Sequence, residues 1–124
     1  MADANNNKPG HIFPLVLKGA AVELGNSDDG DLPLDTSFVS FNITAGGSNT
    51  FNLKDGKVPG QLMVLYCENA DNGNSHIVRI TIESALGVAD NLDEFRLQQP
   101  DESVTLMWNG EAWMPLQINC TFTS

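Results

Sequence analysis

Apolar and polar residues alternate with a period of two along most of the chain, a pattern typical of strands with one buried face. Turn-forming residues separate these alternating segments at intervals of roughly 8–12 residues. This spacing predicts an all-β fold, a small antiparallel sandwich or barrel of about eight short strands. The expected strands are residues 39–44, 51–53, 62–67, 78–82, 95–97, 103–108, 111–114 and 118–122.

One expected strand departs from simple alternation. Residues 62–67 read Leu-Met-Val-Leu-Tyr-Cys and are apolar on both faces. A short run of this kind, following Pro59 and Gly60, favours a fully buried strand over a helix.

Three connections have recognisable turn chemistry. Residues 46–49 are expected to form a hairpin loop, and residues 71–74 a tight turn. The Asn109-Gly110 pair predicts a two-residue hairpin, which would place Trp108 opposite Glu111 rather than opposite Trp113. Residues 84–93 are interpreted as a loop with at most one helical turn.

Residues 1–36 differ from the rest and are expected to form a flexible N-terminal arm and an acidic loop, with the β domain at 37–124. The arm contains an apolar run around Pro14, which cannot donate a ladder hydrogen bond. The run is therefore either an edge strand or a docking element, and both remain open. Its apolar residues are Ile12, Phe13, Leu15, Val16 and Leu17.

Size and charge narrow the functional classes. The chain has 124 residues and 13.4 kDa, which suits one domain. Its 16 acidic and 6 basic residues give a net charge of -10. This balance argues against nucleic acid and against anionic membranes as partners. The N-terminus lacks the regions of a signal peptide, so we expect synthesis in the cytoplasm.

Candidate catalytic groups are sparse. His11 and His76 have no neighbours that suggest a dyad, and Cys67 and Cys120 are interpreted as small hydrophobic residues. Whether the two cysteines pair stays open. The aspartates at 28, 29, 31 and 35 could bind calcium, but a solvated acidic loop fits them better. We expect no enzyme activity, no cofactor and no metal.

Trp108 and Trp113 flank the Asn109-Gly110 turn. Exposed tryptophans there could contact a carbohydrate or a protein. The alternative, which we favour, is that they close the open end of the β core.

The C-terminal half resembles a known family. Residues 101–116, DESVTLMWNGEAWMPL, resemble a hairpin of small β domains on tailed-phage particles, among them capsid decoration (cement) proteins and head or tail fibres. Residues 60–66, 77–82 and 94–97 resemble the strands that precede that hairpin. The resemblance covers residues 37–116, although Met114 and Pro115 replace its usual β-branched run.

The resemblance implies a structural virion protein that binds the major capsid protein on the outside of the head, commonly as a homotrimer. On this basis residues 12–17 are the expected capsid contact, and Leu62, Val64 and Tyr66 the expected self-association surface. The alternative function is a receptor- or glycan-binding fibre domain, for which Trp108 and Trp113 would be exposed.

Overall fold

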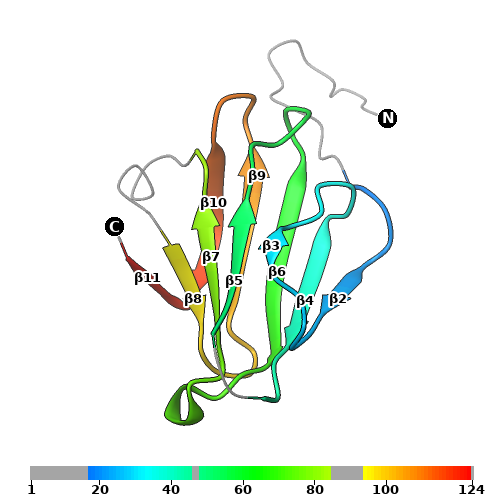
Figure 1. Ribbon diagram of the computed structural model, residues 1–124. Coiled ribbons are helices and arrows are strands. Elements are labelled where there is room, and N and C mark those ends of the chain that lie inside the picture. The colour runs from blue at the N-terminus through cyan, green and yellow to red at the C-terminus, as the bar shows by residue number, and fades with distance from the viewer. Residues whose placement is uncertain (1–16, 46–47, 85–93, 124) are drawn as a thin grey trace, which may run out of the picture.

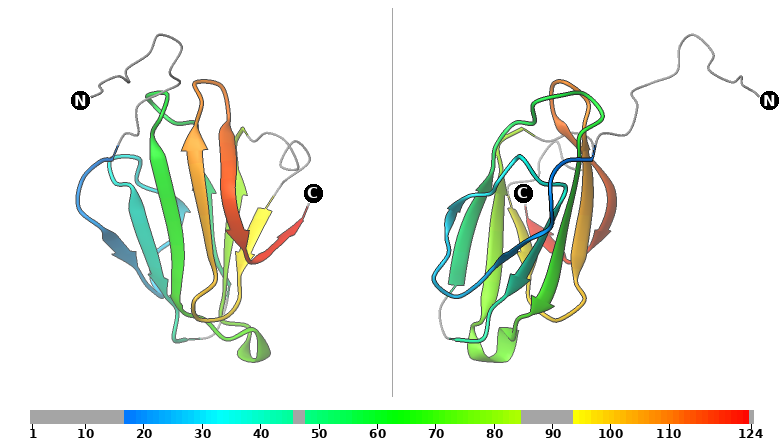
Figure 2. Two further views of the ribbon diagram at one scale, coloured as in Figure 1. Left: turned by 180° about the vertical axis from the view of Figure 1, so that it is seen from behind. Right: turned by 90° about the vertical axis from the view of Figure 1, so that its right-hand side faces the viewer.

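The computed structural model describes residues 17–45, 48–84 and 94–123. They form two five-stranded sheets packed face to face, as the edge-on view of Figure 2 shows. The all-β prediction is confirmed, as a sandwich rather than a closed barrel. Residues 1–16, with most of the predicted arm, and most of the loop expected at 84–93 lie outside the described residues.

The two sheets have the same number of strands and similar pairing (Figure 1). In spatial order, the first sheet contains β10 (Trp113–Asn119), β9 (Ser103–Trp108), β6 (Leu62–Asn69), β4 (Phe38–Asn42) and β2 (Val22–Leu24). The second contains β11 (Thr121–Thr123), β8 (Glu94–Leu97), β7 (Ile77–Ile82), β5 (Ser48–Leu53) and β3 (Gly30–Asp31).

From β2 to β7 the chain alternates between the two sheets, one strand at a time. Consecutive strands of one sheet are therefore joined through a strand of the other, and such a crossover leaves them parallel. The pairs β2–β4, β4–β6, β3–β5 and β5–β7 are parallel, whereas the pairs formed by β8 to β11 are antiparallel. The sheets are thus mixed, not antiparallel throughout as the sequence led us to expect.

Six of the eight expected strands correspond to β4 to β9. The last two, at 111–114 and 118–122, have other bounds in the structure, because β10 continues to Asn119 and β11 begins only at Thr121. Two further strands, β2 and β3, extend the sheets on the N-terminal side, and Leu32 beside β3 is only 3% exposed. Leu24 and Leu34 also pack against the core. The predicted domain boundary at residue 36 is therefore wrong for the described residues, because the segment after residue 21 belongs to the sandwich.

The core lies between the sheets and consists of the inward residues of every long strand. Phe41 of β4 and Phe51 of β5 meet across the two layers with ring centroids 5.2 Å apart. Around them lie the buried residues Val39, Leu53, Met63, Leu65, Val78, Ile80, Phe95, Leu97, Val104 and Leu106. Full burial of one such side chain contributes roughly 1.5–3 kcal/mol.

Two predicted turns have different outcomes. The hairpin expected around residues 46–49 is wrong, because β4 and β5 belong to opposite sheets and Ser48 and Asn49 are part of β5. The turn at 71–74 is confirmed as the 3₁₀ helix η1 (Asn72–Asn74), with an Asp71 carboxylate oxygen accepting a hydrogen bond from the Gly73 amide at 3.0 Å.

None of the described segments forms a helix with the length and apolar character needed to cross a bilayer.

Candidate interaction surfaces

The outer face of the first sheet carries a group of apolar side chains. In β6 the inward residues are buried, whereas Leu62, Val64 and Tyr66 point outward and are half-buried. Leu62 lies opposite Met107 of β9, which lies opposite Met114 of β10. Phe38 of β4 lies opposite Val64. We call these six residues the outer apolar patch: Phe38, Leu62, Val64, Tyr66, Met107 and Met114.

The patch corrects the expectation that residues 62–67 are buried on both faces. The described residues cover only the inner face of β6, so its outward side chains stay partly accessible. Phe38, Met107 and Met114 were not predicted as surface residues from the sequence, although the period-two pattern places each of them at an outward position. Their signal was an apolar residue where alternation predicts a polar one. Phe38 is 39% exposed, and its ring centroid lies 6.2 Å from that of Tyr66.

Tyr66 lies at the margin of the patch and makes a polar contact there. Its hydroxyl donates a hydrogen bond to the Asp101 carboxylate. This hydrogen bond, with a smaller effect of burial, raises the pKa of Tyr66. Asp101 has a positive φ of 72°, and its backbone amide donates to the Cys67 carbonyl at 2.8 Å. The turn before β9 is thereby held against β6.

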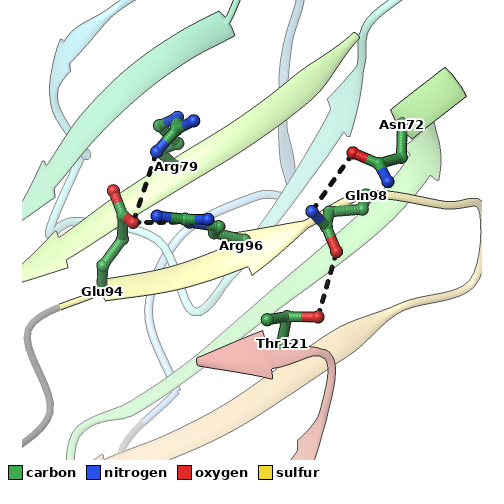
Figure 3. A network of polar contacts seen from close by, with 6 residues as sticks. All are labelled: Asn72, Arg79, Glu94, Arg96, Gln98 and Thr121. Atoms are coloured by element: carbon green, nitrogen blue, oxygen red, sulfur yellow. Dashed lines mark hydrogen bonds and ion pairs between the residues drawn. The ribbon is translucent and has the colours of Figure 1, made fainter. Parts of the chain in front are cut away.

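The outer face of the second sheet is polar instead. Arg79 of β7 and Arg96 of β8 are direct cross-strand partners. Both contact Oε1 of Glu94, at 3.6 and 2.7 Å, so the carboxylate offsets the repulsion between the guanidinium groups (Figure 3). Figure 3 also shows a separate pair of hydrogen bonds nearby, in which Thr121 donates to Gln98 and Gln98 donates to Asn72. This face is suited to contact with water.

Trp108 and Trp113 lie inside the sandwich, so the hypothesis of a surface contact through them is wrong. They are 5% and 0% exposed and meet edge to face with centroids 5.4 Å apart. The Trp113 indole Nε1 donates to the Lys54 carbonyl at 2.8 Å. The tryptophans close one end of the core, as the favoured interpretation predicted.

The turn between the tryptophans also differs from the prediction. Trp108 and Trp113 are direct cross-strand partners, which makes the loop four residues long. The Asn109 side-chain oxygen accepts hydrogen bonds from the Glu111 and Ala112 amides, both at 2.8 Å. This side chain takes the place of a backbone turn, and only Gly110 has a positive φ there.

Of the predicted capsid contact, only Leu17 is described, and it is 66% exposed. Ile12, Phe13, Leu15 and Val16 lie outside the described residues. Lys18 runs beside Ser37, since the Lys18 amide donates to the Ser37 hydroxyl and the Ser37 amide to the Lys18 carbonyl, each at 2.8 Å.

Both cysteines are free thiols in the structure. Cys67 is a core residue, and Cys120 is half-buried and packed against the core. Burial raises the pKa of each thiol to about 12. This fits the interpretation of both residues as small hydrophobic side chains.

Within residues 17–45, 48–84 and 94–123, no three His, Cys, Asp or Glu side chains are grouped as metal ligands would be. Comparison of the chain with protein-family models, curated proteins and solved structures finds no match.

The packing of Gly56 against Trp108 gives a first prediction. A Cβ atom at Gly56 would overlap the Trp108 side chain, whereas one at Gly25 would meet no atom closer than 3.7 Å. Gly56→Ala should lower the free energy of unfolding by about 1–3 kcal/mol, as overpacking does. Gly25→Ala is the control and should change it by less than about 1 kcal/mol. Urea unfolding followed by tryptophan fluorescence measures both, and equal stability of the two variants would contradict the packing.

The thiols give a second prediction. A pKa of about 12 in the folded chain, against 9.0 in the unfolded chain, leaves both thiols protonated at pH 8. Alkylation by iodoacetamide should therefore be about a thousandfold slower than in the unfolded chain, because only the thiolate reacts. Mass spectrometry over time gives the two rates, and equal rates would refute the burial.

The same shift has a consequence for alkaline stability. Above pH 9 the unfolded chain ionises first, so the contribution of each thiol to stability decreases as the pH rises from about 9 to 12. The Cys120→Ala variant should lose less stability than the unmodified chain over this interval.

Proposed function

We propose that the chain is a capsid decoration protein of a tailed phage, which binds the major capsid protein on the outside of the head and stabilises the shell. The resemblance of residues 101–116 to the hairpin of such proteins suggests this class. We further propose that copies associate as trimers on the shell. A partner that binds only the assembled shell stabilises it by mass action, and several linked contacts reinforce one another.

The outer apolar patch is the observation that carries this proposal. Its six residues have no charge, although the chain as a whole carries -10. Large apolar groups gathered on one face of a small domain are typical of contact surfaces between proteins. Leu62, Val64 and Tyr66, proposed from the sequence for self-association, form the centre of the patch. Phe38, Met107 and Met114 enlarge it on both sides.

The polar outer face of the second sheet supports the same assignment. A protein on a particle surface needs one side for contact and another for water. Arg79, Glu94 and Arg96 make the outer face of the second sheet suitable for contact with water. The outer face of the first sheet, which carries the outer apolar patch, is then the side available for contact with a protein. The negative net charge would also keep decorated particles apart.

The alternative, a receptor- or glycan-binding fibre domain, depended on exposed Trp108 and Trp113. Both are buried, so its main support is lost. We therefore retain decoration as the proposed function.

A binding experiment tests the proposal. Undecorated, DNA-filled phage heads are mixed with the purified protein and sedimented, and the bound protein is measured against its free concentration. The unmodified chain should saturate at three copies per site if it binds as a trimer. Val64→Lys places a charge at the centre of the patch and should weaken binding about tenfold or more, since each 1.4 kcal/mol lost corresponds to a factor of ten.

Thr81→Lys is the matched control. It adds the same charge at an exposed position of the polar face and should bind as the unmodified chain does. Circular dichroism establishes that both variants keep their fold. The proposal is refuted if the unmodified chain does not sediment with heads, and the role of the patch is refuted if Val64→Lys binds like the control.

A further inference from the structure

The N-terminal segment enters the described structure beside the outer apolar patch. The paired hydrogen bonds between Lys18 and Ser37 place Lys18 next to the start of β4. Ser37 directly precedes Phe38, which forms one side of the patch. The carbonyl of Ser37 in turn accepts a hydrogen bond from the Val64 amide at 2.8 Å. Residues 12–17 are therefore connected to the sandwich at the margin of its apolar outer face.

The length of this segment matches the width of the patch. From Lys18, the strands β4, β6 and β9 follow in order across the first sheet, so β9 lies about three strand spacings, or roughly 14 Å, away. Phe13 is five residues from Lys18, and an extended chain of that length spans about 16 Å. Phe13 can thus reach Met107 on β9.

The N-terminal segment and the rest of the chain carry net charges of opposite sign. No acidic residue occurs between Asp3 and Glu23, and this stretch contains Lys8 and Lys18. Residues 23–124 contain 15 acidic and 4 basic residues. The segment is therefore the cationic part of an otherwise acidic chain, and its apolar residues are flanked by lysines that acidic surroundings attract.

We propose that, in the free protein, residues 12–16 lie across the outer apolar patch of their own chain, with Phe13 over Met107. Covalent connection beside the patch gives the segment an effective concentration that a separate copy reaches only at high protein concentration. A second copy would also bring two chains of net charge -10 together, whereas the connected segment brings opposite charges together.

Cysteine cross-linking of the full chain tests the contact without any capsid. The double variant Phe13→Cys with Met107→Cys is incubated at low protein concentration with oxidised glutathione, which takes up the two electrons and two protons released as two thiols form one disulfide. Mass spectrometry of the intact chain and its peptides identifies the product. We expect the intrachain disulfide between positions 13 and 107 at a yield at least about tenfold above the control, given the millimolar effective concentration.

The control is Phe13→Cys with Thr81→Cys, which places the second thiol on the polar face of the other sheet. Cys67 and Cys120 stay in both variants, because their raised pKa keeps them protonated under these conditions. Equal yields in the two variants would refute the contact. A disulfide-linked dimer through positions 13 and 107 would refute it too, since the patch would then bind the segment of another copy.

A dye-binding measurement keeps the proposal testable if Met107→Cys disturbs the fold. Phe13→Asp together with Val16→Asp should uncover the patch and raise the fluorescence of an apolar dye such as ANS about threefold or more, because such dyes report accessible apolar surface. The thermal transition of the sandwich should remain. Unchanged dye fluorescence would overturn the proposal. Because neither experiment includes capsids, both outcomes are independent of whether the chain decorates a head.

Discussion

Each long strand of this protein packs one face against the opposite sheet, and this single shared core sets what the rest of the chain can do. Phe41 and Phe51 join the two layers, and the tryptophan pair closes one end. Because the inward positions are committed to this packing, only the outward positions are free to vary between the sheets. They vary strongly: the first sheet presents Leu62, Val64 and Met107, and the second Arg79 and Arg96.

The sequence was informative wherever local chemistry decides the structure. Alternation located β4 to β9 and parts of β10 and β11, and Asp71 marked the turn that η1 forms. It was uninformative about partners. The pattern that marks β4 and β5 as strands does not say that they lie in opposite sheets, so a hairpin was expected between them. The strands β2 and β3 were missed because three and two residues are too short to show a period.

The candidate surface was likewise predictable only in part, where the local sequence of one strand was sufficient. Leu62, Val64 and Tyr66 were recognisable because their strand is apolar on both faces. Phe38, Met107 and Met114 became part of a surface only once the register of four strands aligned them. Trp108 and Trp113 illustrate another case, since the Asn109 side chain accepts hydrogen bonds within a four-residue loop and Trp113 lies opposite Trp108 instead of Leu106. A register difference of two residues leaves each side chain on the same face, so alternation with Val104 and Leu106 is enough to place both rings in the core.

In both sheets the order of strands across the sheet is also their order along the chain, which Figure 1 shows as a progression of colour from one side of the molecule to the other. Each strand therefore adds to an edge that the preceding strands have already formed, and no later strand is inserted between two earlier ones. A chain emerging from a ribosome can assemble such a sandwich in the order of its synthesis.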